Sequence, residues 1–158
     1  MHRCLRLMGS AMTTAAFLAV LAVPVSADVP ASSSGGGTFT FIPNGPPRFA
    51  DGNVIISATL SGTINGTLTG TWTEQAIEVL HPGGSATTHA SGTFTVATPC
   101  GAGSFQFAIE GQQTSQTSPL SGAFRSIDEN TATVGIHTVD SFATVNSSTF
   151  VYSGSYSC

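Results

Sequence analysis

VIISATLSGTINGTLTGTW, residues 54–72, determines the fold class of this chain. Every second residue from Val54 to Trp72 is apolar or glycine, and nearly all the residues between them are Ser, Thr or Asn. A period of two places alternate side chains on opposite faces of an extended chain, which no helical period can do. The stretch therefore predicts β-structure with one buried face and one solvated face.

The same alternation recurs along the rest of the chain, interrupted by short turns rich in Gly, Pro, Asn and Asp. Further strands are predicted at residues 38–42, 71–80, 86–98, 104–110, 120–127, 131–143 and 148–157, with no amphipathic helix. Many short strands in one domain are typical of a barrel or a sandwich. Because the connections are short, we expect an all-β fold, a single antiparallel up-and-down barrel of about eight strands. A β-sandwich is the alternative.

Asn65-Gly66 divides the long alternating stretch and allows two interpretations. A two-residue hairpin turn there would reverse the apolar parity, yet Leu68 and Trp72 keep the parity of Ile64. One interpretation is a three-residue loop over 65–67 that pairs Ile64 with Leu68. The other, slightly favoured, is a continuous strand bent at its glycines, as barrel corners often are.

The N-terminus has the pattern of a secretory signal peptide. Residues 1–6 carry Arg3 and Arg6, an apolar stretch covers 11–25, and small residues precede a predicted cleavage after Ala27. The apolar stretch is too short and interrupted for a membrane span. We therefore expect a secreted protein with a signal peptide at 1–27, a flexible Ser/Gly leader at 28–37, and a barrel domain at 38–158.

Two cysteines stay in the mature chain. Cys4 leaves with the signal peptide, so Cys100 and Cys158 remain as an even pair in an exported protein. Such a pair predicts a disulfide bond.

Charge is sparse and slightly acidic. The chain has no lysine, and the predicted mature part has only two arginines, Arg48 and Arg125. Phosphate backbones and anionic lipid surfaces need cationic contacts, so neither nucleic acid nor such a surface is an expected partner. The many Ser and Thr residues of the solvated faces suit an extracellular surface.

Several Gly-, Thr- and Phe-rich motifs resemble those of a known family. They are LSGTINGTLTGTW at 60–72, GGSA at 83–86, SGTFT at 91–95, GSF at 103–105 and YSGSY at 152–156. Together they resemble a bacterial family of small uncharacterised proteins with the allene oxide cyclase-like barrel. The resemblance implies a bacterial source and an eight-stranded antiparallel barrel with no established activity. The signal peptide and the cysteine pair depart from the usual cytosolic member, and no plant cyclase catalytic residue matches a position here.

Few residues have the spacing of a catalytic or metal site. His81, His89 and His137 have no partner at metal-ligand spacing, and no Gly-x-Ser-x-Gly motif is present. Neither a metal nor a cofactor is therefore expected.

The carboxylates are better candidates for a site. Glu74 and Glu78 continue the buried parity of 54–72, and Asp140 shares the parity of apolar residues in its own strand. A carboxylate inside a barrel has a raised pKa and can act as a general acid or base. Alternatively, the parity shifts at a bulge near Glu74, and Asp140 lies at the rim. Tyr152 points inward, either to line a pocket or to pack in the core.

Seven large rings are expected to fill the interior and leave at most a modest cavity near one mouth. They are Trp72, Phe94, Phe105, Phe107, Phe124, Phe142 and Phe150. The expected polar groups of that mouth are Glu74, Asp140 and Tyr152, as candidate ligand-binding residues.

The sequence therefore favours a non-enzymatic extracellular module with a ligand-binding or structural role. Its expected partner is a small apolar ligand or a cell-envelope polysaccharide. The alternative is a cyclase- or isomerase-like enzyme that uses a buried carboxylate. An internal cavity is needed for a ligand, and an enzyme needs convergent polar groups as well.

Overall fold

The computed structural model describes residues 29–127 and 132–158, and over this part the chain forms nine β-strands and no helix. Their bounds are β1 Ala31–Pro43, β2 Arg48–Ala50, β3 Asn53–Gly66, β4 Thr69–Leu80, β5 Ala86–Thr98, β6 Gly101–Gln113, β7 Ser121–Ile127, β8 His137–Asn146 and β9 Thr149–Ser157.

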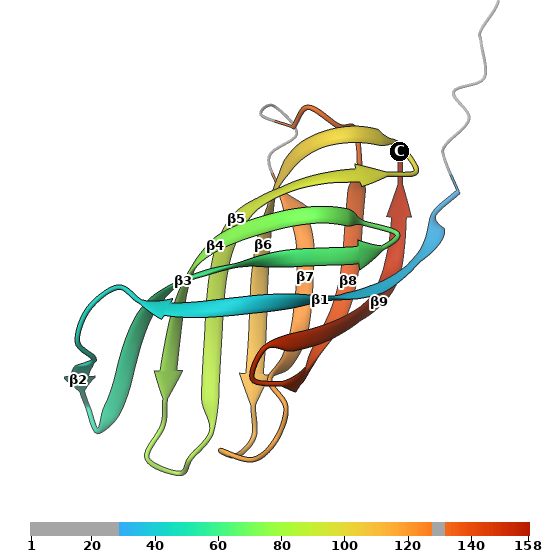
Figure 1. Cartoon of the computed structure of the whole chain (residues 1–158). Helices are drawn as coiled ribbons and strands as arrows, with labels where there is room; N and C mark the ends of the chain where they lie inside the picture. The colour runs from blue at the N-terminus through green and yellow to red at the C-terminus, as the bar shows by residue number, and fades with distance from the viewer. Residues whose placement is uncertain (1–28, 128–131) are drawn as a thin grey trace, which may run out of the picture.

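The strands form a closed antiparallel barrel (Figure 1). From β3 to β9 each strand pairs with its neighbour in sequence, and β1 closes the sheet by pairing with both β9 and β3. The short strand β2 pairs with β3 beside this ring of eight. The predicted up-and-down barrel is confirmed, and the sandwich alternative is wrong.

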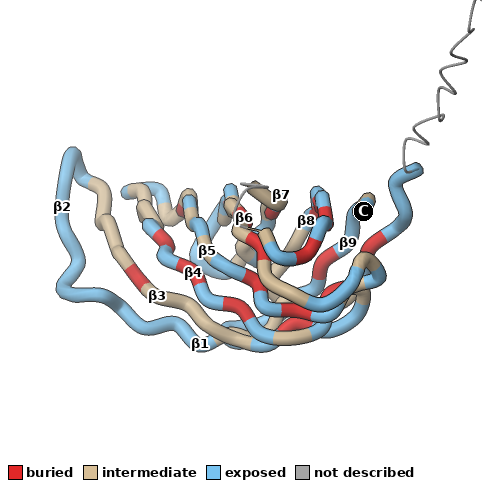
Figure 2. Tube along the Cα trace, turned by 90° about the horizontal axis from the view of Figure 1, so that it is seen from above, coloured by how far each residue is buried: buried red, intermediate tan, exposed pale blue. Residues whose placement is uncertain are grey.

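The interior holds the apolar side chains of the alternating pattern. Buried and exposed residues alternate along the strands, as Figure 2 shows. Five of the seven predicted rings are buried, while Phe142 and Phe150 are partly buried against them. Phe94 packs on Phe107 with ring centroids 4.2 Å apart, and Trp72 makes edge contacts with Phe107 and Phe150.

The chain reverses direction after Gly66, so the favoured interpretation of a bent continuous strand is wrong. β3 and β4 form a hairpin in which Ile64 pairs with Gly70, not with Leu68. Five residues lie between these partners, and this odd number preserves the apolar parity across the turn. Leu68, at the tip, is fully buried and donates its backbone N–H to the Tyr152 hydroxyl at 2.9 Å.

The predicted leader is structured from Ala31 onward, which corrects the expected start of the domain at residue 38. Residues 31–37 pair with β9, and from Gly35 they pair with β3 as well. Their glycines are needed for close packing: a Cβ at Gly35 would lie 2.6 Å from the Tyr152 ring, and one at Gly37 2.6 Å from the Phe150 ring. A Ser- and Gly-rich composition is typical of flexible segments. In residues 31–37 the missing glycine side chains instead leave room for aromatic side chains of β9 to cover β1.

Cys100, in the turn between β5 and β6, forms the predicted disulfide with Cys158. The bond joins Cys158, just after β9, to the turn between β5 and β6. The predicted signal peptide lies outside the described residues. In the described part of the chain, no helix is long and apolar enough to cross a membrane.

Candidate functional site

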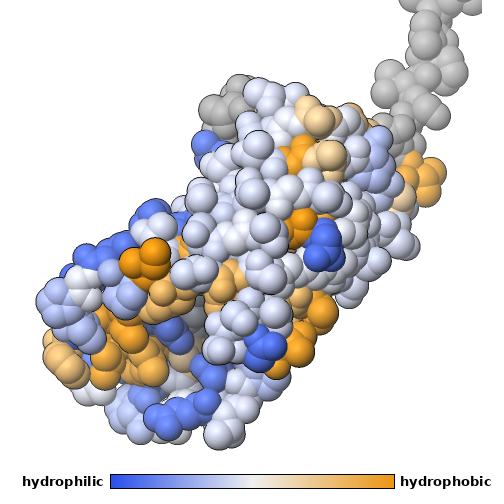
Figure 3. All heavy atoms as spheres, in the orientation of Figure 1, coloured by the Kyte–Doolittle hydropathy of each residue, from blue (hydrophilic) through white to orange (hydrophobic). Residues whose placement is uncertain are grey.

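A cavity of about 730 Å³ occupies one end of the barrel. Its mouth is bordered by the loop between β6 and β7, the turn between β8 and β9, and the end of β1. Apolar side chains gather at this end of the molecule, beside a hollow in the surface (Figure 3). The volume lies within the range of small-molecule sites, so the predicted modest cavity is an underestimate.

Small inward-facing residues explain where the cavity forms. Ala58, Ala76 and Ala90 are direct partners across β3, β4 and β5, and they replace large side chains with methyl groups. On β6, Gly111 pairs with Thr88 and has no side chain at all. The core rings pack against one another beyond these small residues, and six of the seven predicted rings also line the cavity.

The cavity walls are mainly aromatic and aliphatic. Its aromatic lining residues are Phe39, Phe41, Trp72, Phe94, Phe107, Phe124, Phe142 and Phe150. Aromatic walls with few polar groups are typical of sites for small apolar molecules.

Glu74 is the most deeply placed polar group of this cavity. It lies on β4 between its partners Leu60 on β3 and Gly92 on β5, and only 5% of its surface is exposed. The lack of a side chain at Gly92 provides space beside it, since a Cβ there would lie 2.7 Å from the Glu74 Cβ. The carboxylate oxygen Oε2 is buried and has no hydrogen-bond partner. Burial raises the pKa of Glu74 to about 7.

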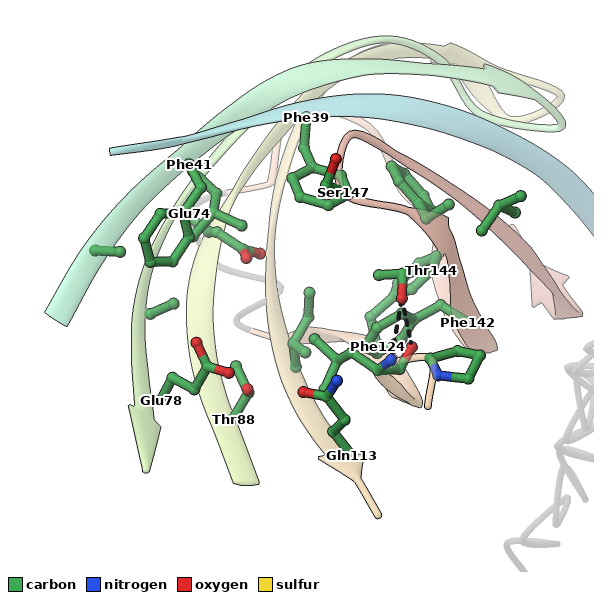
Figure 4. A pocket seen from close by; sticks show the side chains of 18 of the residues that line it. Phe39, Phe41, Glu74, Glu78, Thr88, Gln113, Phe124, Phe142, Thr144 and Ser147 are labelled. Carbon is green, nitrogen blue, oxygen red and sulfur yellow. Dashed lines mark hydrogen bonds between the residues drawn. The ribbon is translucent and has the colours of Figure 1, made fainter. Parts of the chain in front are cut away.

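Glu78 and Thr88 extend this polar wall towards the mouth. Glu78 lies two residues beyond Ala76, on the same inner face of β4. Its cross-strand partner on β5 is Thr88. Both side chains lie on the same wall as Glu74 (Figure 4). Burial raises the pKa of Glu78, and the hydroxyl of Thr88 is buried without a partner.

The pairing of β4 is continuous with both neighbours, so the suggested bulge near Glu74 is absent. Ile77 faces outward, with 47% of its surface exposed, which explains why an apolar residue stands between two inward acids.

Electrostatically, the cavity is acidic. Among the described residues that line it, Glu74 and Glu78 are the titratable groups, and no lysine, arginine or histidine is present. The remaining polar groups are amides and hydroxyls, including Gln113 across from the acids.

Asp140 and Tyr152 lie outside the cavity lining, so the structure separates them from Glu74. Asp140 is fully buried on β8, and its two carboxylate oxygens accept hydrogen bonds from the hydroxyls of Ser33 and Thr138. Burial raises the pKa of Asp140, while these two hydrogen bonds oppose the shift. In this position the acid connects β8 to β1.

Tyr152 is a core residue with a satisfied hydroxyl. That hydroxyl accepts the backbone N–H of Leu68 and donates to the carbonyl of Asn65 at 3.3 Å, while the ring packs on Phe124. It therefore holds the β3–β4 hairpin against β9.

Thr88 and Gln113 were missed by the sequence interpretation. Thr88 shares the parity of Ala90 and Phe94 in its strand, and this parity was sufficient to place it inside. Gln113 lies where β6 enters a polar loop. Apolar and polar residues do not alternate there, so the sequence pattern could not place its side chain.

The described residues contain no group of three His, Cys, Asp or Glu side chains that could hold a metal ion. His81 shares a 2.9 Å hydrogen bond with the side chain of Asn53, and His89 is exposed on the outer face.

Comparison with known proteins shows similarity in fold. No family model and no curated protein matches the chain. The chain is similar to a solved structure from Shewanella oneidensis MR-1, a protein of unknown function from the DUF3224 family. The TM-score is 0.63 at 17% sequence identity, and the match covers 80% of this chain and 96% of that one. At this identity the likeness concerns the barrel fold alone.

Proposed function

We propose that this protein is an extracellular binding module that holds one small, mainly apolar molecule in its barrel. The observation that carries the proposal is the cavity of about 730 Å³ with aromatic walls and an unpartnered Glu74 oxygen. Buried polar atoms without partners are rare in folded proteins and are often sites where a ligand or water is bound. A ligand would bury its apolar body against the rings and supply the missing hydrogen bond.

Export is part of this proposal. The signal-peptide pattern at 1–27 favours secretion, and the Cys100–Cys158 disulfide is compatible with an oxidising compartment. Contact between the Ser- and Thr-rich outer face and an envelope polysaccharide stays a prediction from the sequence. So does the relationship to the family with the allene oxide cyclase-like barrel.

A cyclase- or isomerase-like enzyme is the second candidate, and the raised pKa of Glu74 favours it. A carboxyl group with a pKa of about 7 is suited to proton transfer at neutral pH. Such a group needs an orienting partner and a second convergent group, whereas Glu74 Oε2 has no hydrogen-bond partner. We therefore rank binding above catalysis.

Trp72 provides a direct test, because it is the sole tryptophan and lines the cavity. We expect titration with 1-octanol to change its fluorescence saturably. Ala76→Phe, which places a ring inside the cavity, should weaken binding at least tenfold. The matched control is Ala97→Phe, on the exposed face of β5, which should bind like the unmodified protein. Circular dichroism would confirm that both variants fold.

Two outcomes contradict the proposal: no saturable fluorescence change with 1-octanol or with the amine and carboxylate of the same tail length, or equal affinity in Ala76→Phe and the unmodified protein. Conversion of a bound probe into a new product would favour the enzyme instead.

A further inference from the structure

We propose that the cavity selects an apolar molecule that carries one ammonium group, and that Glu74 pairs with this group. The inference rests on the proposed binding function and names the chemical class of its ligand.

The sign of the charge is the first argument. Both titratable groups of the described lining are carboxylates, Glu74 and Glu78, and no cationic side chain compensates them. Once Glu74 is ionised, a ligand carboxylate or phosphate would meet a like charge in a partly desolvated space. An ammonium group instead meets two carboxyl groups, with Glu78 nearer the mouth and Glu74 at the deeper position (Figure 4).

The unpartnered oxygen is the second argument. Glu74 Oε2 is buried without a hydrogen-bond partner, and only 5% of the residue's surface is exposed. A ligand hydroxyl could donate one hydrogen bond to it but would leave an ionised carboxylate uncompensated. An ammonium group donates the bond, carries the compensating charge and has two further donors for other acceptors.

The surrounding rings provide the third argument. Trp72 precedes Glu74 by one inward position on β4, and Phe107 lies on β6 in the cross-strand row of Glu74 and Gly92. Aromatic faces attract cations and also bury an alkyl body. These rings therefore lie next to Glu74, where they can contact both the head and the tail of such a molecule.

Binding of an ammonium group should depend on pH. An ammonium group prefers ionised Glu74, so its affinity should increase about tenfold per pH unit below the Glu74 pKa of about 7 and level off above it. Glu78 is the other titratable group facing this space from β4. The lining residues of β1, β3, β5, β6, β7, β8 and β9 provide no titratable group.

The experiment compares n-octylamine, 1-octanol and octanoate, which share one tail length, by Trp72 fluorescence and calorimetry at pH 5 and pH 8. At pH 8 we expect the amine to bind at least tenfold more tightly than the alcohol, and octanoate most weakly. Glu74→Gln removes the charge, so it should lower amine affinity at pH 8 at least tenfold. Glu110→Gln removes an exposed acid on β6 and is the matched control.

The outcomes separate the two proposals. If the alcohol binds as well as the amine, or if Glu74→Gln leaves amine affinity unchanged, the ligand class is wrong while the binding function stands. If none of the three molecules binds, both fail. The pH dependence of amine binding by the unmodified protein tests the pairing without any variant: equal affinity at pH 5 and pH 8 would overturn it.

Discussion

Replacing Glu74 with glutamine should change how the stability of the barrel depends on pH. Burial raises the pKa of this acid from 4.5 to about 7 in the folded protein. Below pH 4.5 both the folded and the unfolded chain bind the proton, so the group contributes no pH dependence. Between 4.5 and 7 the unfolded chain releases the proton while the folded chain keeps it. The free energy of unfolding therefore falls as pH rises, and the loss is complete above pH 7.

The size of the effect follows from the two pKa values. One pKa unit corresponds to about 1.4 kcal/mol, so a change from 4.5 to about 7 corresponds to about 3 kcal/mol. Glutamine has nearly the shape of the protonated acid and does not titrate. The unfolding free energy of Glu74→Gln minus that of the unmodified protein should therefore increase by about 3 kcal/mol between pH 4 and pH 8.

Urea denaturation followed by Trp72 fluorescence measures this difference, since Trp72 is buried in the folded barrel. Glu110→Gln, at an exposed position on β6, is the control for the removal of a carboxylate. A pH-independent difference for Glu74→Gln would refute the reasoning, because the folded acid would then titrate like the unfolded one.

Three further predictions concern the core and the closure of the barrel. Phe107 is fully buried, so Phe107→Ala should lower the unfolding free energy by about 3–5 kcal/mol, measured by urea denaturation; an unchanged value would contradict its inward position. Replacing Cys100 and Cys158 by serine should lower the unfolding free energy by about 4 kcal/mol, because the bond joins residues 58 positions apart in the sequence. Mass spectrometry that finds two alkylatable thiols in the native protein would show that the bond does not form. Ser33→Ala removes a donor to a buried Asp140 oxygen and should cost about 1–3 kcal/mol, and no loss would indicate that residues 31–37 do not pair as part of the barrel.

The fold could be predicted because strand parity is a local property. A side chain's face depends only on its position in an alternating segment, so the buried rings and Glu74 were placed inside from the sequence. Turn geometry was harder, because both a bent strand and a hairpin with an odd loop preserve parity. The two are distinguished by the pairing of β3 with β4, in which Ile64 lies opposite Gly70.

The cavity could not be predicted, since it depends on register between strands. Ala58, Ala76 and Ala90 are separated in sequence, and only the lengths of the two intervening turns bring them side by side. From seven large rings the sequence predicts at most a modest cavity near one mouth. Their distribution along the barrel axis, not their number, determines how much space remains.

Two buried acids in this barrel show how a structural carboxylate differs from one available for binding. Both oxygens of Asp140 accept hydroxyl hydrogen bonds, so the acid is integrated into the contact between β8 and β1. Glu74 has similar burial, yet its Oε2 atom has no partner, its cross-strand neighbour is a glycine, and the space beside it is open. An apolar residue at this position would avoid the cost of burying a carboxyl group. Glutamate at this position therefore costs stability and leaves a hydrogen-bond acceptor facing an apolar cavity. For this reason the binding proposal is built on Glu74 rather than on Asp140.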